Sequence, residues 1–355
     1  MKKIALIPII YGLFLAGSLA YSALDTFVIE RTLKLKTSYY NPYENESVNV
    51  KKSNKTSKNS IIDPTSSNEN HSTSIKPYSY EDSSSSSSQQ GDWFSDTVIQ
   101  TENLYVDQNV RVEIKKEVIQ TLLLKGEGTR DTLVYSADIR ISHRTHFKTD
   151  FVKDEDGWPK TNKEEKASVM ARANNAPFAI NGDTFGAQKK GYVVRNGQLF
   201  RQDRRAGTDD LIVYGDGSFE MRNEDDYKIK DLMKDNPYQV FSFGPALVNN
   251  GVRVVEKGTE VAIFDAKNNN QRVSIGIVEP LHYVVAVCDA RLTDSYGMQL
   301  FEMADYMIGL GAQIAYNLDG GGSASFVFNG ELLNRPCTYP NQIEERGVSD
   351  IIFFA

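Results

Sequence analysis

The sequence contains few of the residues that build disulfide frameworks, metal centres or nucleic-acid surfaces. Its 355 residues include two cysteines and four histidines, which is too few for a multi-disulfide scaffold and argues against a histidine-rich metal site. The formal net charge is −7 at pH 7, and Lys and Arg form no dense cluster. Because nucleic-acid binding relies on clustered cations that neutralise phosphates, we expect no nucleic-acid partner.

Nucleotide-binding motifs are also absent from the sequence. No Gly-Lys-Ser/Thr follows the glycine-rich stretch near the C-terminus, and no G-x-G-x-x-G occurs, so neither a Walker A loop nor a dinucleotide fingerprint is present. Cys288 lies in an apolar run and is predicted to be a small core residue, with a single bridge to Cys337 as the alternative. His143 and His146 are interpreted as a polar strand face or loop rather than as a metal pair.

The N-terminus carries a long apolar segment. Lys2 and Lys3 precede an apolar run over residues 4–23, and about twenty residues suffice to span a bilayer as a helix. The length favours an uncleaved anchor, whereas the small residues before Ala23 allow a cleaved signal peptide instead. We therefore predict a single-pass cell-membrane protein with its large domain outside the cytoplasm, or alternatively a secreted one.

Composition divides the chain into three parts. Residues 1–24 form the anchor or signal, and residues 25–96 read as a flexible Ser/Asn/Lys-rich tether that ends near the unbroken serine run 83–88. Such a polar segment buries too little apolar surface to offset its ordering entropy. Residues 97–355 are long enough for one substantial core and are predicted to be the catalytic domain.

The pattern of the large domain predicts an α+β fold with a mixed β-sheet, flanking helices, many hairpins and one βαβ crossover. Helices are expected over residues 164–174, with Val169 and Ala173 on one face, and over residues 298–310, ending before Gly311. Four dipeptides suit tight hairpin turns: Asn196-Gly197, Asp216-Gly217, Asn250-Gly251 and Asn329-Gly330.

The expected crossover brings two aspartates together. An apolar strand over residues 281–288 is followed by Asp289, and after the second helix another strand over residues 313–318 is followed by Asp319. A strand–helix–strand unit of this spacing predicts that the two strands are parallel. Both carboxylates should then lie at the same edge of the sheet, where α/β sheets commonly bind ligands.

A glycine-rich loop follows the second of these aspartates. Gly320, Gly321 and Gly322 would let the backbone approach a ligand closely and turn its amides toward an anion, and Ser323 comes next. A tight turn is the alternative interpretation. Paired carboxylates, a nearby arginine and an amide-rich loop are the groups that cleavage of a glycosyl phosphodiester would need.

Three further features accompany this segment. An apolar run leads into Asn181, Gly182 and Asp183, a Gly-Pro kink lies in residues 243–247, and Arg272 opens another strand. Taken singly, each of these features is typical of a structural turn or strand end.

Together these blocks resemble the phosphodiester glycosidase family, which includes many bacterial proteins associated with exopolysaccharides. The signature is YNLDGGGSASFVFNG at residues 316–330. Other blocks follow the order of the family: AINGDTFG (179–186), GYVVRNGQLFR (191–201), FGPALVNNG (243–251), RVSIGI (272–277) and VCDAR (287–291). The resemblance covers residues 135–354. Ala290 replaces a usual glycine, Val273-Ser274 replaces Thr-Ala, and Thr184 stands where an aromatic residue is common.

The resemblance implies hydrolysis of a sugar-1-phosphodiester. Its candidate catalytic residues, without assignment of acid, base, or retaining or inverting outcome, are Asp319, Asp289 and Asp183. Its candidate substrate- and phosphate-binding residues are Arg272, Arg291, Asn181, Gly182, Gly320, Gly321, Gly322 and Ser323.

The expected partners follow from the same resemblance. The substrate would be a glycan or glycosyl phosphodiester of the cell envelope or an exopolysaccharide, with no cofactor required and a divalent cation such as Ca²⁺ conceivable. The N-terminal helix would contact the membrane, and the oligomeric state is not determined by the sequence. Two alternatives stay open: a non-catalytic surface module that binds a phosphate-containing polysaccharide or teichoic acid, and a phosphodiesterase that cleaves the P–O bond.

Overall fold

The computed structural model describes residues 93–123, 127–152, 163–259 and 268–355. The predicted anchor over residues 1–24 and all of the tether up to residue 92 lie outside these ranges. Within them, no helix is both long enough and apolar enough to cross a membrane. The predicted domain boundaries, the anchor and the localisation therefore stay predictions.

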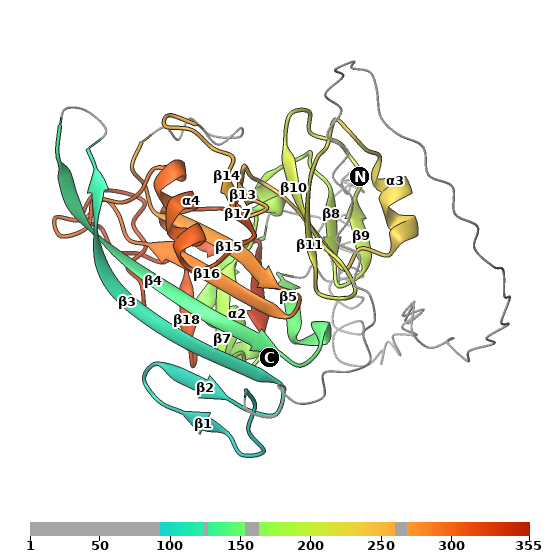
Figure 1. The fold of residues 1–355 in the computed structure, drawn as a ribbon, viewed down its shortest axis with the longest axis horizontal. Coiled ribbons are helices and arrows are strands. Elements are labelled where there is room, and N and C mark those ends of the chain that lie inside the picture. The colour runs from blue at the N-terminus through green and yellow to red at the C-terminus, as the bar shows by residue number, and fades with distance from the viewer. Residues whose placement is uncertain (1–92, 124–126, 153–162, 260–267) are drawn as a thin grey trace, which may run out of the picture. The chain divides into compact units, whose positions relative to one another are not determined.

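Most strands belong to three antiparallel sheets (Figure 1). The largest has nine strands, in the order β1 (Ile99–Gln100), β2 (Leu104–Val106), β3 (Val110–Leu122), β4 (Thr129–Ile141), β16 (His282–Cys288), β15 (Arg272–Glu279), β17 (Ile314–Leu318), β13 (Ala246–Asn249) and β14 (Val252–Arg253). Helix α4 (Leu300–Gly309) packs against β13 to β17 of this sheet.

Two five-stranded sheets complete the described domain. One has the order β11 (Phe219–Asn223), β10 (Asp209–Val213), β12 (Gln239–Ser242), β8 (Val193–Arg195) and β9 (Gln198–Arg201). The other has the order β19 (Glu331–Leu332), β18 (Phe326–Phe328), β7 (Phe178–Asn181), β21 (Asp350–Phe354) and β5 (Phe147–Phe151). A short pair joins β20 (Gly347–Val348) to β6 (Glu165–Lys166).

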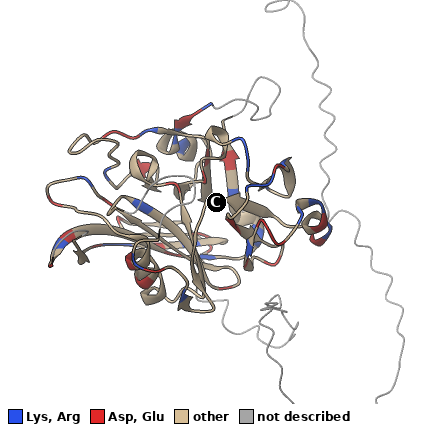
Figure 2. Ribbon diagram, turned by 90° about the horizontal axis from the view of Figure 1, so that it is seen from above, with Lys and Arg blue, Asp and Glu red and all other residues tan. Residues whose placement is uncertain are grey.

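Helical segments in the described ranges are few and short. The remaining α-helices are α2 (Ala167–Ala173) and α3 (Ile229–Leu232). The 3₁₀ turns are η2 (Arg144–His146), η3 (Phe185–Ala187), η4 (Met233–Asp235) and η5 (Gly321–Ser323). Lys and Arg are interspersed with Asp and Glu along the described ribbon (Figure 2).

The predicted α+β class with a mixed sheet and a βαβ crossover is wrong. The described domain is mainly β-structure, and all of its strand pairs are antiparallel. Strand β15 lies between β16 and β17 and pairs antiparallel with both. The physical reason is the hairpin between β15 and β16. Because β15 already occupies the position next to β16, the strand that follows helix α4 cannot take that position.

The four predicted hairpin turns are confirmed. They join β8 to β9, β10 to β11, β13 to β14 and β18 to β19. Asn196, Asn250 and Asn329 all have positive φ, as do the glycines that follow them, which is the conformation that a type I′ turn requires. The Asp216-Gly217 turn differs, because only Gly217 has a positive φ, of 85°.

The helix predictions are confirmed in part. Helix α4 buries Leu300, Met303, Ala304 and Met307, and it begins at a capping box between Gln299 and Glu302. The predicted helix over residues 164–174 is reduced to α2, because its first residues pair as β6 with β20. Val169 and Ala173, predicted to share one face, lie one turn apart in α2 and are both exposed.

Helix α2 buries a different set of residues from this pair. Val169 is 37% exposed, whereas Met170 and Ala171 are buried. Cys288 and Cys337 are both buried and unbridged. His143 precedes η2 and the Nδ1 atom of His146 lies 2.8 Å from the carbonyl oxygen of Ala355, which confirms that the two histidines lie in a loop.

Candidate active site

One edge of the nine-stranded sheet gathers the predicted chemistry. In the register of the sheet, Arg272 at the start of β15 pairs with Cys288 at the end of β16, and Val273 pairs with Leu318 at the end of β17. Asp289 and Asp319, which follow these two strand ends, therefore lie at the same edge on either side of β15. The shared edge was predicted, but the strand between the two carboxylates was not.

All three predicted catalytic aspartates are buried, and Asp319 has the largest exposed fraction of the three. It is 6% exposed, compared with 0% for both Asp183 and Asp289. The side chains of Ser323 and Thr184 and the amide of Gly320 lie near its carboxyl and favour the ionised form. Burial raises the pKa of Asp319 above the ordinary value, while Ser323 and the nearby positive charge oppose this increase. A carboxyl with a raised pKa is suited to proton transfer near neutral pH.

The loop after Asp319 is held by its neighbours. Asn181 donates from Nδ2 to the Asp319 carbonyl oxygen over 2.8 Å, and its Oδ1 accepts from the Ser325 amide over 3.0 Å. A Cβ atom on Gly320 would lie 2.3 Å from the carbonyl oxygen of Gln271, so only glycine fits there. Asn181 therefore positions this loop from the neighbouring sheet.

The predicted anion-binding amides are largely engaged within the protein. The Gly321 amide donates to the carbonyl oxygen of Gln271 over 3.1 Å, and the Ser323 amide donates to the carbonyl oxygen of Gly320 over 3.2 Å. A Cβ atom on Gly322 would lie 2.1 Å from Oγ1 of Thr338. The glycines thus serve close packing between the loop and its neighbours as well as any contact with a ligand.

Arginine side chains surround the same loop. Arg346 donates to the Ser323 hydroxyl, and its Nη2 lies 3.5 Å from Oδ2 of Asp319. Arg291 adopts a positive φ of 59° and donates to the carbonyl oxygens of Cys337 and Thr338. Burial lowers the pKa of Arg291, and the charge on Arg346 lowers it further. Their proximity makes this edge attractive to an anion.

Arg272 adds a third, more deeply buried guanidinium. It is 3% exposed and donates to the carbonyl oxygens of Met298 and Asn268. Burial, with a smaller contribution from the charge on Arg291, lowers the pKa of Arg272 to about 10. Arg272 therefore supplies positive charge from beneath the surface, whereas Arg291 and Arg346 are more exposed.

Asp289 is bound at both of its carboxyl oxygens. Oδ1 accepts from the Arg335 amide over 2.9 Å, and Oδ2 accepts from Arg335 Nε over 2.8 Å. Arg335 also pairs with the exposed Asp294. Burial raises the pKa of Asp289, and Arg335 opposes the rise. This geometry ties the segment after β19 to the end of β16.

Asp183 is likewise engaged within the protein. Its Oδ1 accepts from Arg195 Nη2 over 2.7 Å and from the Phe185 amide over 3.1 Å, and its Oδ2 accepts from the Ser242 amide over 2.9 Å. Arg195 is bound in turn by Asp350. Asp350 can approach this turn closely only because residue 182 is glycine: a Cβ at Gly182 would lie 2.2 Å from Oδ1 of Asp350.

Four functional or supporting residues were missed by the sequence reasoning: Arg195, Arg335, Arg346 and Asp350. Arg195 lies inside the GYVVRNGQLFR block, so the resemblance offered a signal for it. Arg335, Arg346 and Asp350 lie in the C-terminal segment outside every block considered, and no motif marks them. In the described part of the chain, no group of three His, Cys, Asp or Glu side chains is arranged to hold a metal ion, and the conceivable Ca²⁺ stays a prediction.

Comparisons with known proteins agree with the resemblance. A sequence model described as phosphodiester glycosidase matches residues 174–355, a range that includes Asp183, Asp289 and Asp319. The chain is similar in fold to the auto-inhibited catalytic domain of zebrafish N-acetylglucosamine-1-phosphodiester α-N-acetylglucosaminidase, with 21% identity, a TM-score of 0.54, and coverage of 70% of this chain and 89% of that one.

A curated bacterial relative matches about half of the chain. The SPβ prophage-derived uncharacterized protein YomE of Bacillus subtilis (strain 168) is 25% identical over 172 residues. This match covers 48% of the present chain and 26% of that protein, so the matched stretch is about a quarter of the relative's length.

Proposed function

The chain belongs to the phosphodiester glycosidase family, and we propose that it hydrolyses the glycosidic bond of a sugar-1-phosphodiester. The observation that carries the proposal is the environment of Asp319. This carboxyl has a raised pKa and lies at a sheet edge with Arg346 at 3.5 Å, and the Arg291 guanidinium lies beside Gly321 of the loop that follows. A proton-transfer group beside clustered guanidinium groups suits a substrate in which a sugar is linked to phosphate.

The bond changes define what each group must do. Water adds to C1 of the sugar, the bond between C1 and the bridging oxygen breaks, and the phosphate leaves as a monoester. That leaving group is a weak base, so its departure depends more on stabilisation of negative charge than on a proton. We assign charge stabilisation to Arg291 and Arg346, which replace the carboxylic acid of an ordinary glycosidase.

Asp319 then needs to be ionised in the reacting enzyme. As a carboxylate it takes the proton of the attacking water, or it attacks C1 directly and releases the sugar in a second step. Asp289 and Asp183 are proposed to position the site rather than to react, because guanidinium and amide groups already bind their carboxyl oxygens.

The biological substrate belongs to the same proposal. We propose a cell-envelope glycan or an exopolysaccharide, reached by an extracytoplasmic domain that is tethered to the membrane or secreted. The support is the apolar run at residues 4–23 and the polar stretch that follows it. Fractionation of cells that express the full chain, with protease accessibility of the domain, tests this localisation: an intracellular, protease-resistant domain would contradict it.

The activity is tested with the purified full chain and methyl phosphodiesters of α- and β-linked glucose and N-acetylglucosamine. We expect free reducing sugar and methyl phosphate as products. The variant Asp319→Asn should lose at least a hundredfold in kcat, in line with removal of an acid–base group. The variant Asp231→Asn, at an exposed position on α3, is the matched control and should keep full activity.

The pH profile and the products distinguish the alternatives. Because burial raises the pKa of Asp319, kcat/KM should fall as the pH is lowered through that pKa, above the ordinary carboxyl value of about 4. A sugar phosphate as product would mean that the P–O bond is cleaved. Binding of all four diesters without any turnover would instead favour the non-catalytic module.

A further inference from the structure

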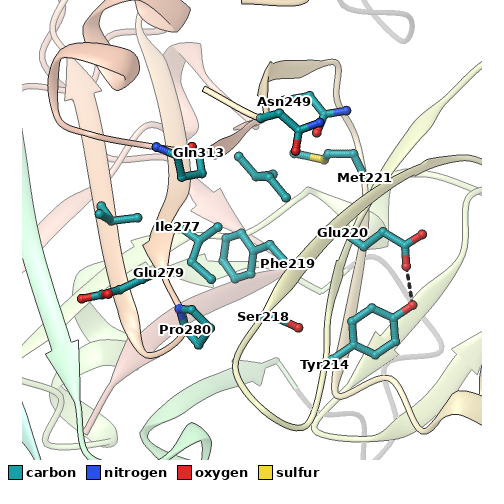
Figure 3. Close-up of a pocket in the computed structure, with 13 residues that line it drawn as sticks. Tyr214, Ser218, Phe219, Glu220, Met221, Asn249, Ile277, Glu279, Pro280 and Gln313 are labelled. Carbon is teal, nitrogen blue, oxygen red and sulfur yellow. Dashed lines mark hydrogen bonds between the residues drawn. The ribbon is translucent and has the colours of Figure 1, made fainter. Parts of the chain in front are cut away.

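A pocket of about 330 Å³ opens at the other end of the same strands (Figure 3). It lies between the β10–β11 hairpin, the β13–β14 hairpin and the turn from β15 to β16. Strand β15 runs for eight residues from Arg272 to Glu279, so the pocket is roughly 24 Å from the edge that carries Asp319. None of the residues that line it belongs to the candidate active site.

The floor of the pocket is apolar and is built on strands. Phe219 of β11 and Ile277 of β15 are each 5% exposed, and Ile314 of β17 and Met221 complete the surface. In Figure 3 the ring of Phe219 lies beside Ile277 near the centre of the pocket. Because these side chains are held by hydrogen-bonded strands, the concave surface is formed before any ligand arrives.

Uncharged amides form part of the rim. Asn249, Asn250 and Gln313 line the pocket. Among the described residues, neither asparagine side chain makes a hydrogen bond within the protein, and Gln313 makes one long contact of 3.4 Å from Nε2 to the Gly311 carbonyl oxygen. Each amide can both donate and accept hydrogen bonds, so the rim can pair with neighbouring hydroxyl groups of a ligand.

The charges around the pocket are already compensated. Glu220 accepts from the hydroxyl of Tyr214 and pairs with Arg222 over 2.6 Å, and Glu279 pairs with Arg140 over 3.3 Å. Lys and Arg do not occur among the described lining residues. The pocket therefore offers no cation to a phosphate or carboxylate and no uncompensated carboxylate to an amine.

We propose that this pocket binds a neutral saccharide unit, with the C–H face of the sugar on Phe219 and its hydroxyl groups on the amide rim. An apolar floor with a few convergent uncharged polar groups suits a ligand that is apolar on one face and hydroxylated at its edges. The proposal does not rest on the proposed reaction, because the two sites share no residue and lie at opposite ends of β15.

The proposal is tested by calorimetric titration of the full chain with maltose, cellobiose and N,N′-diacetylchitobiose. Glucose 6-phosphate serves as the anionic probe and cyclohexanol as the apolar probe. We expect at least one neutral disaccharide to bind with a millimolar Kd and more tightly than either of the other two probes. Binding of none of the three, or tighter binding of an anionic or apolar probe, would overturn the assignment.

Variants locate the binding. The double change Asn249→Ala and Gln313→Ala should weaken disaccharide binding about tenfold, which corresponds to ~1.4 kcal/mol. Gln198→Ala, an exposed change on β9, is the matched control and should not alter the Kd. Met221→Trp, which fills the pocket and leaves the amides in place, provides an independent test.

Each variant is first checked for an unchanged thermal transition, so that loss of binding is not loss of the fold. Disaccharide binding that survives both Met221→Trp and the double amide change, but is lost in Asp319→Asn, would place the sugar at the other site. That result would overturn the proposal and leave the glycosidase assignment intact. Loss of catalysis in Asp319→Asn with disaccharide binding unchanged would instead support two separate sites.

Discussion

Arg195 offers the sharpest test of how the site is supported. Its guanidinium is fully buried between Asp183, at 2.7 Å, and Asp350, at 2.9 Å. It also donates to the carbonyl oxygens of Val194 and Val240. One cation thus compensates two buried acids. It also holds in place the turn that follows β7, which lies near Asp319 in the fold.

The change Arg195→Met keeps much of the side-chain volume and removes the charge. It leaves the two carboxyl groups without their cation and the two carbonyl oxygens without a donor. Removal of one partner from a buried ion pair costs about 3–5 kcal/mol. In a domain of this size, a loss of 1 kcal/mol lowers Tm by about 2–4 °C, so we expect a decrease of roughly 6–20 °C.

The assay is equilibrium unfolding in urea, followed by circular dichroism, which avoids the ionic screening that guanidinium would add. The control is Arg222→Met, which breaks a pair with Glu220 whose partners are 29% and 18% exposed and should cost about 1 kcal/mol or less. A loss below about 1 kcal/mol in Arg195→Met would refute the reasoning. It would mean that water or relaxation of the chain compensates Asp183 and Asp350 without the arginine.

Two further predictions concern the loop and the same buried cluster. Gly320→Ala should destabilise the protein by about 1–3 kcal/mol because the new Cβ would meet the Gln271 carbonyl oxygen at 2.3 Å. Gly309→Ala, at a position with open space at the end of α4, should stabilise it by about 0.5–1 kcal/mol. Urea unfolding that ranks the two variants in the opposite order would contradict this prediction. Burial raises the pKa of Asp350 to about 7. Protonation of Asp350 therefore contributes stability that is present below the unfolded pKa of about 4 and is lost as the pH rises through 7. This loss of stability should disappear in Asp350→Asn, and an identical pH dependence of stability in both proteins would contradict the prediction.

The candidate site was predictable only as a set of residues. The aspartates and the glycine-rich loop were predictable because strand ends, glycines and family blocks can each be identified from a short segment of sequence. Which of the buried aspartates keeps the largest exposed fraction could not be predicted in this way. Asp289 is bound by Arg335, 46 positions away, and Asp350 is bound by Arg195, 155 positions away. No pattern in the sequence pairs residues at such separations.

The fold shows the same division. Local rules were sufficient for the four hairpin turns, where Asn and Gly tolerate positive φ, and for α4, where the spacing of apolar residues and Gly311 indicate the helix and its end. The order of strands was not determined locally: β15 joins β16 through a short hairpin, but on its other side Val273 pairs with Leu318 of β17, 45 positions away. The sequence alone therefore determined the turns, the main helix and the family. Tertiary packing decided the antiparallel sheet order and left Asp319, rather than Asp289 or Asp183, as the least buried carboxyl. The physical reason is that turn and helix preferences act over a few residues, whereas strand order and buried ion pairs depend on contacts between distant segments.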